Sequence, residues 1–248
     1  ITLPEGITAI GASAFHGCMN LTDIVIPNSV TGMGHQVFEQ CKGLESAVLS
    51  NGMGEIVNGL FYNCNALESI VIPGSVKSIG SSAFYGCSSL TSITIPNNVT
   101  SIGKYAFQEC SSLKEIIIPD KVESIGDCAF IECISLESVT FGASLANIGK
   151  QAFYNCFSLE NITISNGNIS IGENAFHNTA WYDSKPAGVL YIGKMLYTYK
   201  GHMPENTHIT VEEGTLGIAA NAFAGCTNLK GITFPKTVEC IESYSFKG

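Results

Sequence analysis

The chain has 248 residues and a net charge of −9, and charged residues make up 13% of it, against roughly 25% in ordinary globular proteins. All twelve basic residues are Lys. An acidic chain without Arg lacks the side chains that grip phosphate and guanine, which argues against nucleic acid as a partner. The apolar residues occur in groups well below the ~18 residues of a membrane-span candidate, so the chain is not expected to be membrane-embedded.

Phe residues recur at a fixed spacing along most of the chain. Seven successive spacings of 23 residues separate the first eight of them, and two more follow in nearly the same register. They are Phe15, Phe38, Phe61, Phe84, Phe107, Phe130, Phe153, Phe176, Phe223 and Phe246. A fixed period of this length indicates a repeat protein, in which each unit buries its apolar side by stacking on its neighbours.

Eight of the ten cysteines lie three residues after these Phe residues, one per repeat: Cys18, Cys41, Cys64, Cys87, Cys110, Cys133, Cys156 and Cys226. Equivalent positions of adjacent strands lie ~4.8 Å apart with parallel Cβ vectors. A disulfide requires Cβ atoms at roughly 3.5–4.5 Å on converging vectors. The spacing therefore predicts a column of buried free thiols, and it offers no C-x-x-C pair for zinc.

The unit from 90 to 112 illustrates the local structure that we expect. Ile93 to Ile95 alternates apolar and polar residues like a strand with one buried face, and Pro96 ends that strand because it has no N–H. Ala106, Phe107 and Cys110 then follow at three- and four-residue steps, the period of a helical turn. Each unit is therefore predicted to contain a short strand, an extended return and about one turn of helix.

This combination resembles the leucine-rich repeat, with Ile in place of most Leu. The recurring A-F-x-x-C and I-G elements are similar to those of BspA-like repeats of bacterial and protist surface proteins. The resemblance implies an α/β repeat solenoid: a right-handed superhelix of about eleven coils, with parallel strands on the concave face and helical turns on the convex side. It also implies a secreted or cell-surface protein that takes part in adhesion.

Residues 177–206 depart from the repeat and hold Trp181, the only Trp. Two apolar runs joined at Gly193–Lys194 predict a hairpin with a type II′ turn. We therefore expect one solenoid domain over 1–248, with regular repeats at 1–176 and 207–248 around an aromatic insert. The insert has two open interpretations: it covers core at a joint of the solenoid, or it presents an aromatic binding patch.

No motif of a catalytic, nucleotide-binding or metal site occurs, such as G-x-S-x-G, G-x-G-x-x-G or H-E-x-x-H. The chain is therefore not expected to be an enzyme or to carry a cofactor. Ile1 begins inside the repeat pattern and no signal peptide opens the chain, so we expect a piece of a longer, exported array.

The favoured hypothesis is a protein-binding module, an adhesin or receptor-like domain for an extracellular matrix or host cell-surface protein. Its contacts would come from the outward strand positions, which are β-branched: Val25, Val48, Val71, Thr94, Ile117, Thr140, Thr163, Thr210 and Thr233. The insert would add a landmark that near-identical repeats lack. The predicted contacts are Trp181, Tyr191, Tyr197 and Tyr199 with Thr163 and Thr210. The alternatives are a carbohydrate-binding module, with the aromatic rings as stacking platforms, and a structural spacer.

Overall fold

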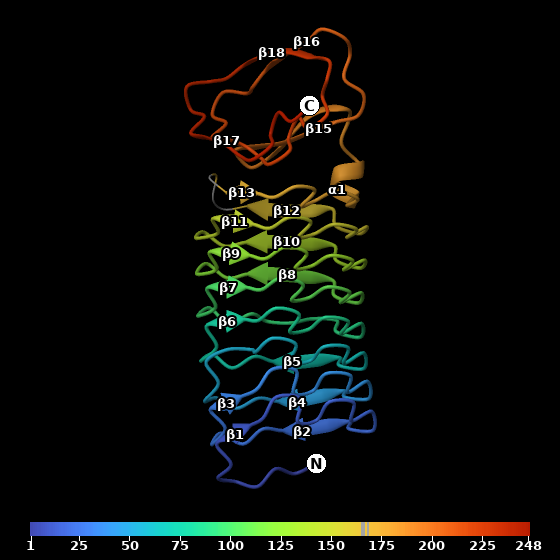
Figure 1. Cartoon of the computed structure of the whole chain (residues 1–248), viewed down its shortest axis with the longest axis vertical. Helices are drawn as coiled ribbons and strands as arrows, with labels where there is room; N and C mark the ends of the chain where they lie inside the picture. Colours follow the sequence, from blue (N-terminus) through green and yellow to red (C-terminus); the bar gives the residue numbers. More distant parts are fainter. Residues whose placement is uncertain (165–166, 168) are drawn as a thin grey trace.

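The computed structural model describes residues 1–164, 167 and 169–248. It is a parallel β-solenoid of about 10 turns, with coils of about 23 residues stacked along one axis (Figure 1). The sequence prediction of about eleven coils was therefore slightly too high. The described part of the chain contains no helix whose length and hydropathy would let it cross a lipid bilayer.

A first column of strands lies where each unit alternates apolar and polar residues. Its members are β2 (Asp23–Val25), β4 (Ser46–Val48), β5 (Ser69–Val71), β8 (Glu115–Ile118), β10 (Ser138–Phe141) and β12 (Asn161–Ile164). Neighbours pair in parallel, with partners 23 residues apart, and Thr94 joins the column through a bridge to Val71. We call the outward side of this column the strand face.

The return path of each coil forms a second column of shorter strands. These are β1 (Ala9–Ile10), β3 (Gly32–Met33), β6 (Ser78–Ile79), β7 (Ser101–Ile102), β9 (Ser124–Ile125), β11 (Asn147–Ile148) and β13 (Ser170–Ile171). In this column β6, β7, β9, β11 and β13 pair in parallel one after another, at the same positions of successive coils, and Ile56 bridges to Ile79. The chain therefore has two parallel β-columns, where the sequence predicted strands from one part of each unit.

The predicted helical turn beside each Phe is absent, so the α/β description was wrong for these units. Tyr105 and Glu109, two residues either side of Phe107, have φ values of +58° and +59°, which a right-handed helix does not allow. Their N–H groups donate to Asp127 and Ile131 of the next coil, at 3.0 Å each. The residues between them form local three-residue turns, such as the turn closed by the hydrogen bond from Cys110 N–H to Phe107 O at 3.2 Å. These turns place apolar residues three apart, as a helix does, which explains the misleading period.

The Phe column fills the centre of the solenoid. Phe107 is fully buried between Phe84 and Phe130, with ring centroids 5.2 and 5.0 Å away and nearly parallel planes. The same stacking continues from Phe15 to Phe176. This confirms the register that the 23-residue spacing predicts.

The regular coils are followed by α1 (Ala180–Asp183) and by an antiparallel hairpin of β14 (Gly188–Ile192) and β15 (Met195–Lys200). The predicted hairpin is thus present, and the φ of +57° at Gly193 suits the first position of a type II′ turn. The last coils contribute β16 (Thr207–Thr210), β17 (Gly217–Ile218), β18 (Leu229–Thr233) and β19 (Cys240–Ile241). β15 pairs in parallel with β17, and β16 pairs with β18.

The hairpin lies between two hydrophobic cores. Met195 and Tyr197 pack into the core of the regular coils, whereas Leu196 between them packs with Ile218 and Phe223 of the last coils. Side chains of successive strand residues point to opposite faces, so one strand can serve both cores. β15 therefore joins the two parts of the solenoid.

Candidate binding surface

The strand face is an exposed stripe of β-branched side chains. Val25, Val48, Val71 and Ile117 are 56%, 57%, 81% and 66% exposed, although the residues on either side of each are buried or point to the core. Thr94, Thr140, Thr163, Thr210 and Thr233 are exposed at the equivalent positions. All nine outward positions predicted from the sequence therefore face solvent.

Two grooves lie along this face. The first has a volume of about 470 Å³ and is lined by the valine positions of three successive coils together with Pro27 and Pro73. The second, of about 240 Å³, lies further along the face around Thr94 and Ile117. Each Pro ends a strand and removes an N–H donor from the groove wall. Polar side chains also line the grooves, Asn28 in the first and Asn97 in the second among them.

Carboxylates flank the starts of the strands on this face. Asp23 and Glu115 begin β2 and β8, and four Glu residues immediately precede β4, β5, β10 and β12: Glu45, Glu68, Glu137 and Glu160. All six are exposed, and none takes part in the ion pairs of the described residues. Lys114, before β8, is the one basic residue in this row of the regular coils, and Lys230 holds the equivalent position in β18. We call the row the acidic rim; aligning the repeats in columns would have revealed it, because the carboxylates recur at two adjacent positions.

Tyr197 lies in the core and does not form part of an exposed patch. Its side chain is 3% exposed, and its hydroxyl accepts a hydrogen bond of 2.9 Å from the backbone N–H of Phe176. In the regular coils this N–H donates to the next coil, as Phe153 N–H does to Ala175 O at 2.8 Å. Burial raises the pKa of Tyr197 above its ordinary value. The expected partner contact at Tyr197 is therefore corrected to a structural role.

Trp181 packs at the joint and is half-buried. Its indole ring and the Phe176 ring are arranged edge to face with centroids 6.3 Å apart, and the Lys185 ammonium lies 5.4 Å from the indole centroid. Lys200 of β15 donates to the carbonyls of Tyr182, Asp183 and Lys185 at 2.8, 3.0 and 2.7 Å, which ties α1 to the hairpin.

Tyr191 and Tyr199 are half-buried against the second core. The Tyr191 hydroxyl accepts the backbone N–H of Glu212 at 3.1 Å, and burial raises the pKa of this side chain. The Tyr199 ring lies 6.4 Å from Phe223. Of the four aromatic residues predicted from the insert, Trp181, Tyr191 and Tyr199 thus keep a solvent-facing part.

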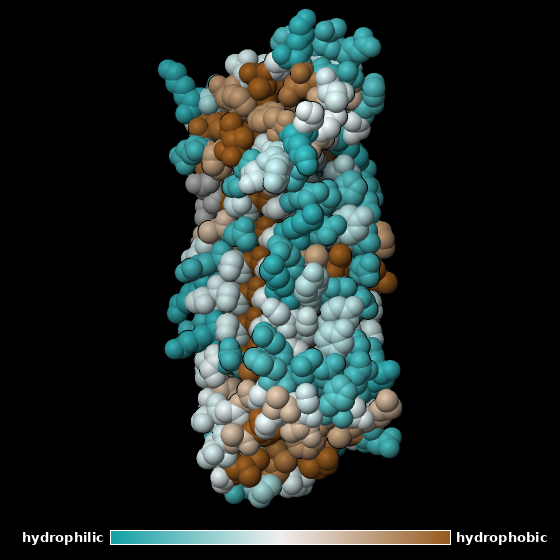
Figure 2. Space-filling model, in the orientation of Figure 1, coloured by the Kyte–Doolittle hydropathy of each residue, from teal (hydrophilic) through white to brown (hydrophobic). Residues whose placement is uncertain are grey.

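Thr163 and Thr210 lie on either side of the insert, in different sheets. Thr163 belongs to β12 at the end of the regular column, and Thr210 belongs to β16, which pairs only with β18 among the described strands. Polar side chains cover most of the visible face in Figure 2, and apolar ones gather near the two ends of the solenoid. The structure brings the two Thr residues to the borders of the insert without joining them in one sheet.

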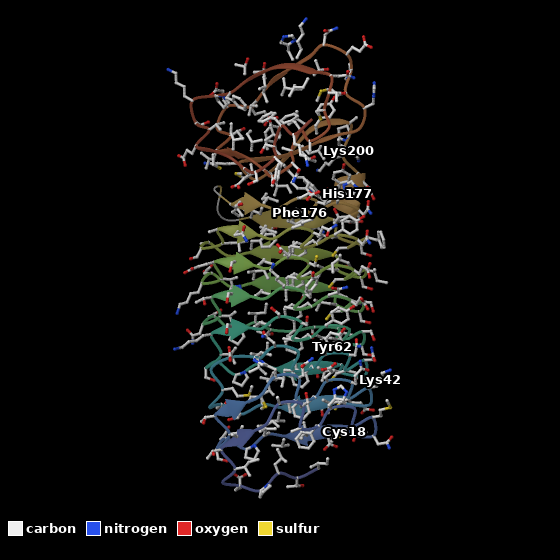
Figure 3. All side chains as sticks on the ribbon, in the orientation of Figure 1. Cys18, Lys42, Tyr62, Phe176, His177 and Lys200 are labelled. Carbon is white, nitrogen blue, oxygen red and sulfur yellow. The ribbon has the colours of Figure 1, made fainter. Side chains whose placement is uncertain are left out.

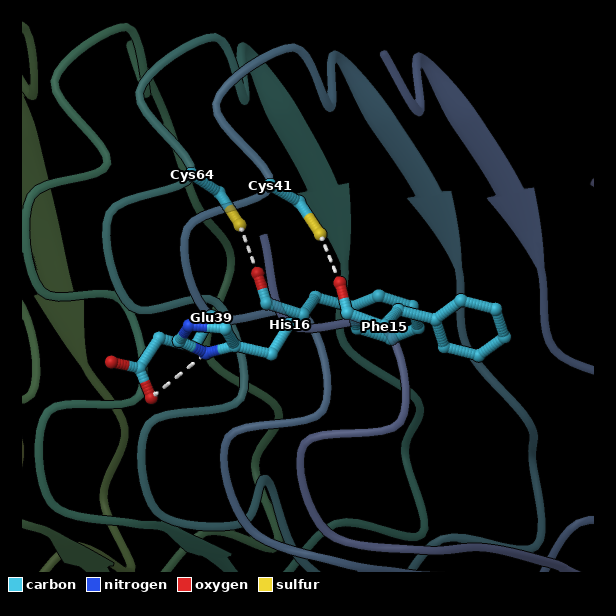
Figure 4. A network of polar contacts seen from close by, with 6 residues as sticks. Phe15, His16, Glu39, Cys41 and Cys64 are labelled. Carbon is cyan, nitrogen blue, oxygen red and sulfur yellow. Dashed lines mark hydrogen bonds and ion pairs between the residues drawn. The ribbon is translucent and has the colours of Figure 1, made fainter. Parts of the chain in front are cut away.

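The cysteine column is buried from Cys41 to Cys156, and these thiols are hydrogen-bonded. Cys41 and Cys64 donate to the carbonyls of Phe15 and Phe38, 26 residues earlier, at 3.0 and 3.1 Å (Figure 4). All ten cysteines are free thiols, and burial raises the pKa of Cys41 from 9.0 to about 11. The sequence predicted the burial but not the hydrogen bonds. Within the described ranges, no group of three or more His, Cys, Asp or Glu residues could hold a metal ion.

Comparisons with known proteins agree with this geometry. The profile of the BspA type leucine rich repeat region matches residues 1–114, 77–200 and 192–248. A leucine-rich-repeat protein of T. pallidum is 31% identical over 64% of this chain and 77% of its own, with a TM-score of 0.59. One from Bacteroides ovatus ATCC 8483 is 25% identical over 100% of this chain and 84% of its own, with a TM-score of 0.52. No curated protein matches the chain. With matches that together span the solenoid from end to end, the chain belongs to the BspA-type leucine-rich-repeat family.

Proposed function

We propose that the protein is a non-catalytic protein-binding module, displayed on a cell surface or secreted, that acts as an adhesin or receptor-like domain. The observation that carries this proposal is the exposed β-branched stripe of the strand face, with its two grooves. Exposed apolar surface that the fold does not need is typical of interaction sites. Membership of a repeat family whose proteins commonly act as interaction modules supports the same proposal.

The acidic rim indicates the chemistry of the partner. Six carboxylates against one Lys along the strand starts of the regular coils favour a partner with basic residues beside an apolar stripe. Complementary charge of this kind raises association rates and fixes orientation. An extracellular matrix or host cell-surface protein is the class that we propose.

The insert supplies the landmark in this proposal. Trp181, Tyr191 and Tyr199 keep solvent-facing parts, and Thr163 and Thr210 are exposed at its borders. A partner that binds along a nearly uniform stripe could bind at several positions along the solenoid. Contact with one unique position would fix its register. We propose that these five residues fix it, within a single domain spanning 1–248.

The test is binding of the purified chain to immobilised matrix proteins and, in parallel, to a glycan array. We expect saturable binding to at least one matrix protein that weakens at high salt. Binding to glycans alone would replace the proposal with the carbohydrate-binding alternative. Binding to neither would favour the structural spacer.

A further inference from the structure

A third groove lies on a different edge of the solenoid. Residues that follow each Phe form the turns at which the strands of the first column begin, and Figure 3 shows Cys18, Lys42, Tyr62 and His177 along this edge. We call it the turn edge. A groove of about 470 Å³ crosses several coils there, and its walls include Ser88, Ser111 and two Glu residues.

Two coils break the polar pattern of the turn edge at this groove. Four residues after the Phe, the first coil carries Met19 and the next four carry Lys42, Asn65, Ser88 and Ser111, but the two after them carry Ile134 and Phe157. Ile134 is 44% exposed and Phe157 is 57% exposed, and both line the groove. Neither side chain is needed by the core, because the same position is polar in the four coils directly before them. Adjacent exposed apolar residues beside a groove are typical of a contact site.

The same groove carries two adjacent carboxylates. Glu109 and Glu132 occupy equivalent positions of successive coils, so their backbones lie ~4.8 Å apart. Glu109 Oε1 accepts hydrogen bonds from Tyr85 Oη at 2.7 Å and Gln108 Nε2 at 3.1 Å, which fixes its direction. No Lys lines the groove, and no ion pair of the described residues includes either Glu.

These two Glu residues are unfavourable for stability. Like charges on neighbouring rungs repel, and both residues adopt left-handed backbone, with φ of +59° and +62°, where Asn or Gly is preferred. Other coils do place Asn63, Gly86 and Asn155 at this position. A bound cation would relieve the repulsion, which is the physical reason to look for one here.

We infer that this groove docks an extended segment of a protein partner in which a Lys or Arg lies beside a bulky apolar residue. The basic group would lie between Glu109 and Glu132, and the apolar side chain would cover Ile134 and Phe157. An ammonium or guanidinium near the Phe157 ring gains a further cation–π attraction. Phosphorylated or sulfated ligands do not fit, because the groove offers them no positive group. The inference is independent of the strand face and remains if that proposal fails.

The test is selection of binders from a random peptide library on the immobilised full chain. We expect the selected peptides to combine Lys or Arg with a neighbouring Leu, Ile or Phe. Their affinity should fall about tenfold on Glu132→Gln or Phe157→Ser. The matched controls, Glu123→Gln beside the second strand column and Met19→Ser, both at exposed positions outside the groove, should leave it unchanged. Selected peptides without basic residues, no enrichment at all, or equal losses on the controls would overturn the inference.

A second readout needs no ligand. Removing one of two like charges should raise the melting temperature of Glu132→Gln by about 1–2 °C at low salt. The same change at the exposed Glu123, whose equivalent positions in the adjacent coils are Thr100 and Ala146, should leave it unaltered. An unchanged or lower melting temperature for Glu132→Gln would contradict the argument from repulsion.

Discussion

The hydroxyl of Tyr197 takes the place of a backbone carbonyl of the repeat. In a regular array, a carbonyl oxygen of the next coil would accept the N–H of Phe176. Here the phenol oxygen of Tyr197, on the hairpin, accepts it at 2.9 Å. The ring also lies edge-on to Phe176, with centroids 5.9 Å apart. One side chain therefore ends both the Phe column and a line of inter-coil hydrogen bonds.

We predict that Tyr197→Phe lowers the free energy of unfolding by about 1–3 kcal/mol, because it leaves a buried N–H without an acceptor. Urea denaturation followed by circular dichroism measures the change. Tyr199→Phe is the matched control: Tyr199 is half-buried, so the loss of its hydroxyl should cost less than about 0.5 kcal/mol. Equal effects of the two variants would contradict the role given to Tyr197.

The buried thiols make stability dependent on alkaline pH. Burial raises the pKa of Cys41 to about 11 and raises those of Cys64, Cys87, Cys110 and Cys156 as well. In the unfolded chain a thiol loses its proton near its ordinary value of 9.0. Above that pH the folded state binds more protons than the unfolded state, so the free energy of unfolding falls as pH rises.

The urea midpoint is therefore predicted to be steady up to about pH 8 and to fall between about pH 9 and about pH 11. A variant with Cys41, Cys64 and Cys87 changed to Ala separates the thiols from Lys and Tyr, which also titrate in this range. Its midpoint should fall less steeply with pH, whatever its stability at neutral pH. Equal slopes for the two proteins would show that the thiols are not responsible.

At the scale of the element, the strands of the first column were predictable, whereas the second column and the turns were not. Alternating residues such as Ile116 and Ile118 mark the strands, and the fixed period places them in register. The turns depend on left-handed backbone at Tyr105, Glu109 and their equivalents. Bulky and charged residues at such positions do not reveal left-handed backbone in the sequence. The three-residue spacing of the apolar residues was therefore interpreted as a helical turn. Only the Asn and Gly residues in the same columns hinted otherwise.

Gly126 shows how closely the coils approach. A Cβ atom there would lie 2.5 Å from the backbone N of Lys104 and 2.7 Å from the carbonyl carbon of Gly103, both in the preceding coil. We predict that Gly126→Ala costs about 2 kcal/mol or more, since the neighbouring backbone cannot move without disturbing its own coil.

Gly74→Ala is the control, because no atom lies within 4 Å of its Cβ position. The control should change the free energy of unfolding by less than about 0.5 kcal/mol. Thermal or urea unfolding of both variants gives the comparison. If Gly126→Ala left the free energy of unfolding unchanged, the coils would be more loosely stacked than they are in the structure.

At the scale of the whole molecule, the insert was recognised from the sequence, but its role in joining two hydrophobic cores was not. The loss of register after Phe176 and the Gly193–Lys194 turn predicted a hairpin. Its division between two cores depends on how Leu196 and Tyr197 point to opposite sides of β15, which becomes visible only when the last coils are placed. The binding residues were proposed from aromatic content alone, and packing removes Tyr197 from that set.

Binding through the strand face is the central claim, and a lysine scan tests it most directly. A single Lys is placed at each outward position from Val25 to Thr233, and affinity for the matrix protein captured by the wild type is measured by surface plasmon resonance. The control series places Lys at exposed positions beside the second strand column, at Thr100 and Ala146. We predict losses of about tenfold or more on the strand face, greatest at Thr163 and Thr210 beside the insert, and none in the control series. Undiminished binding by every strand-face variant, or equal losses in the control series, would contradict the account.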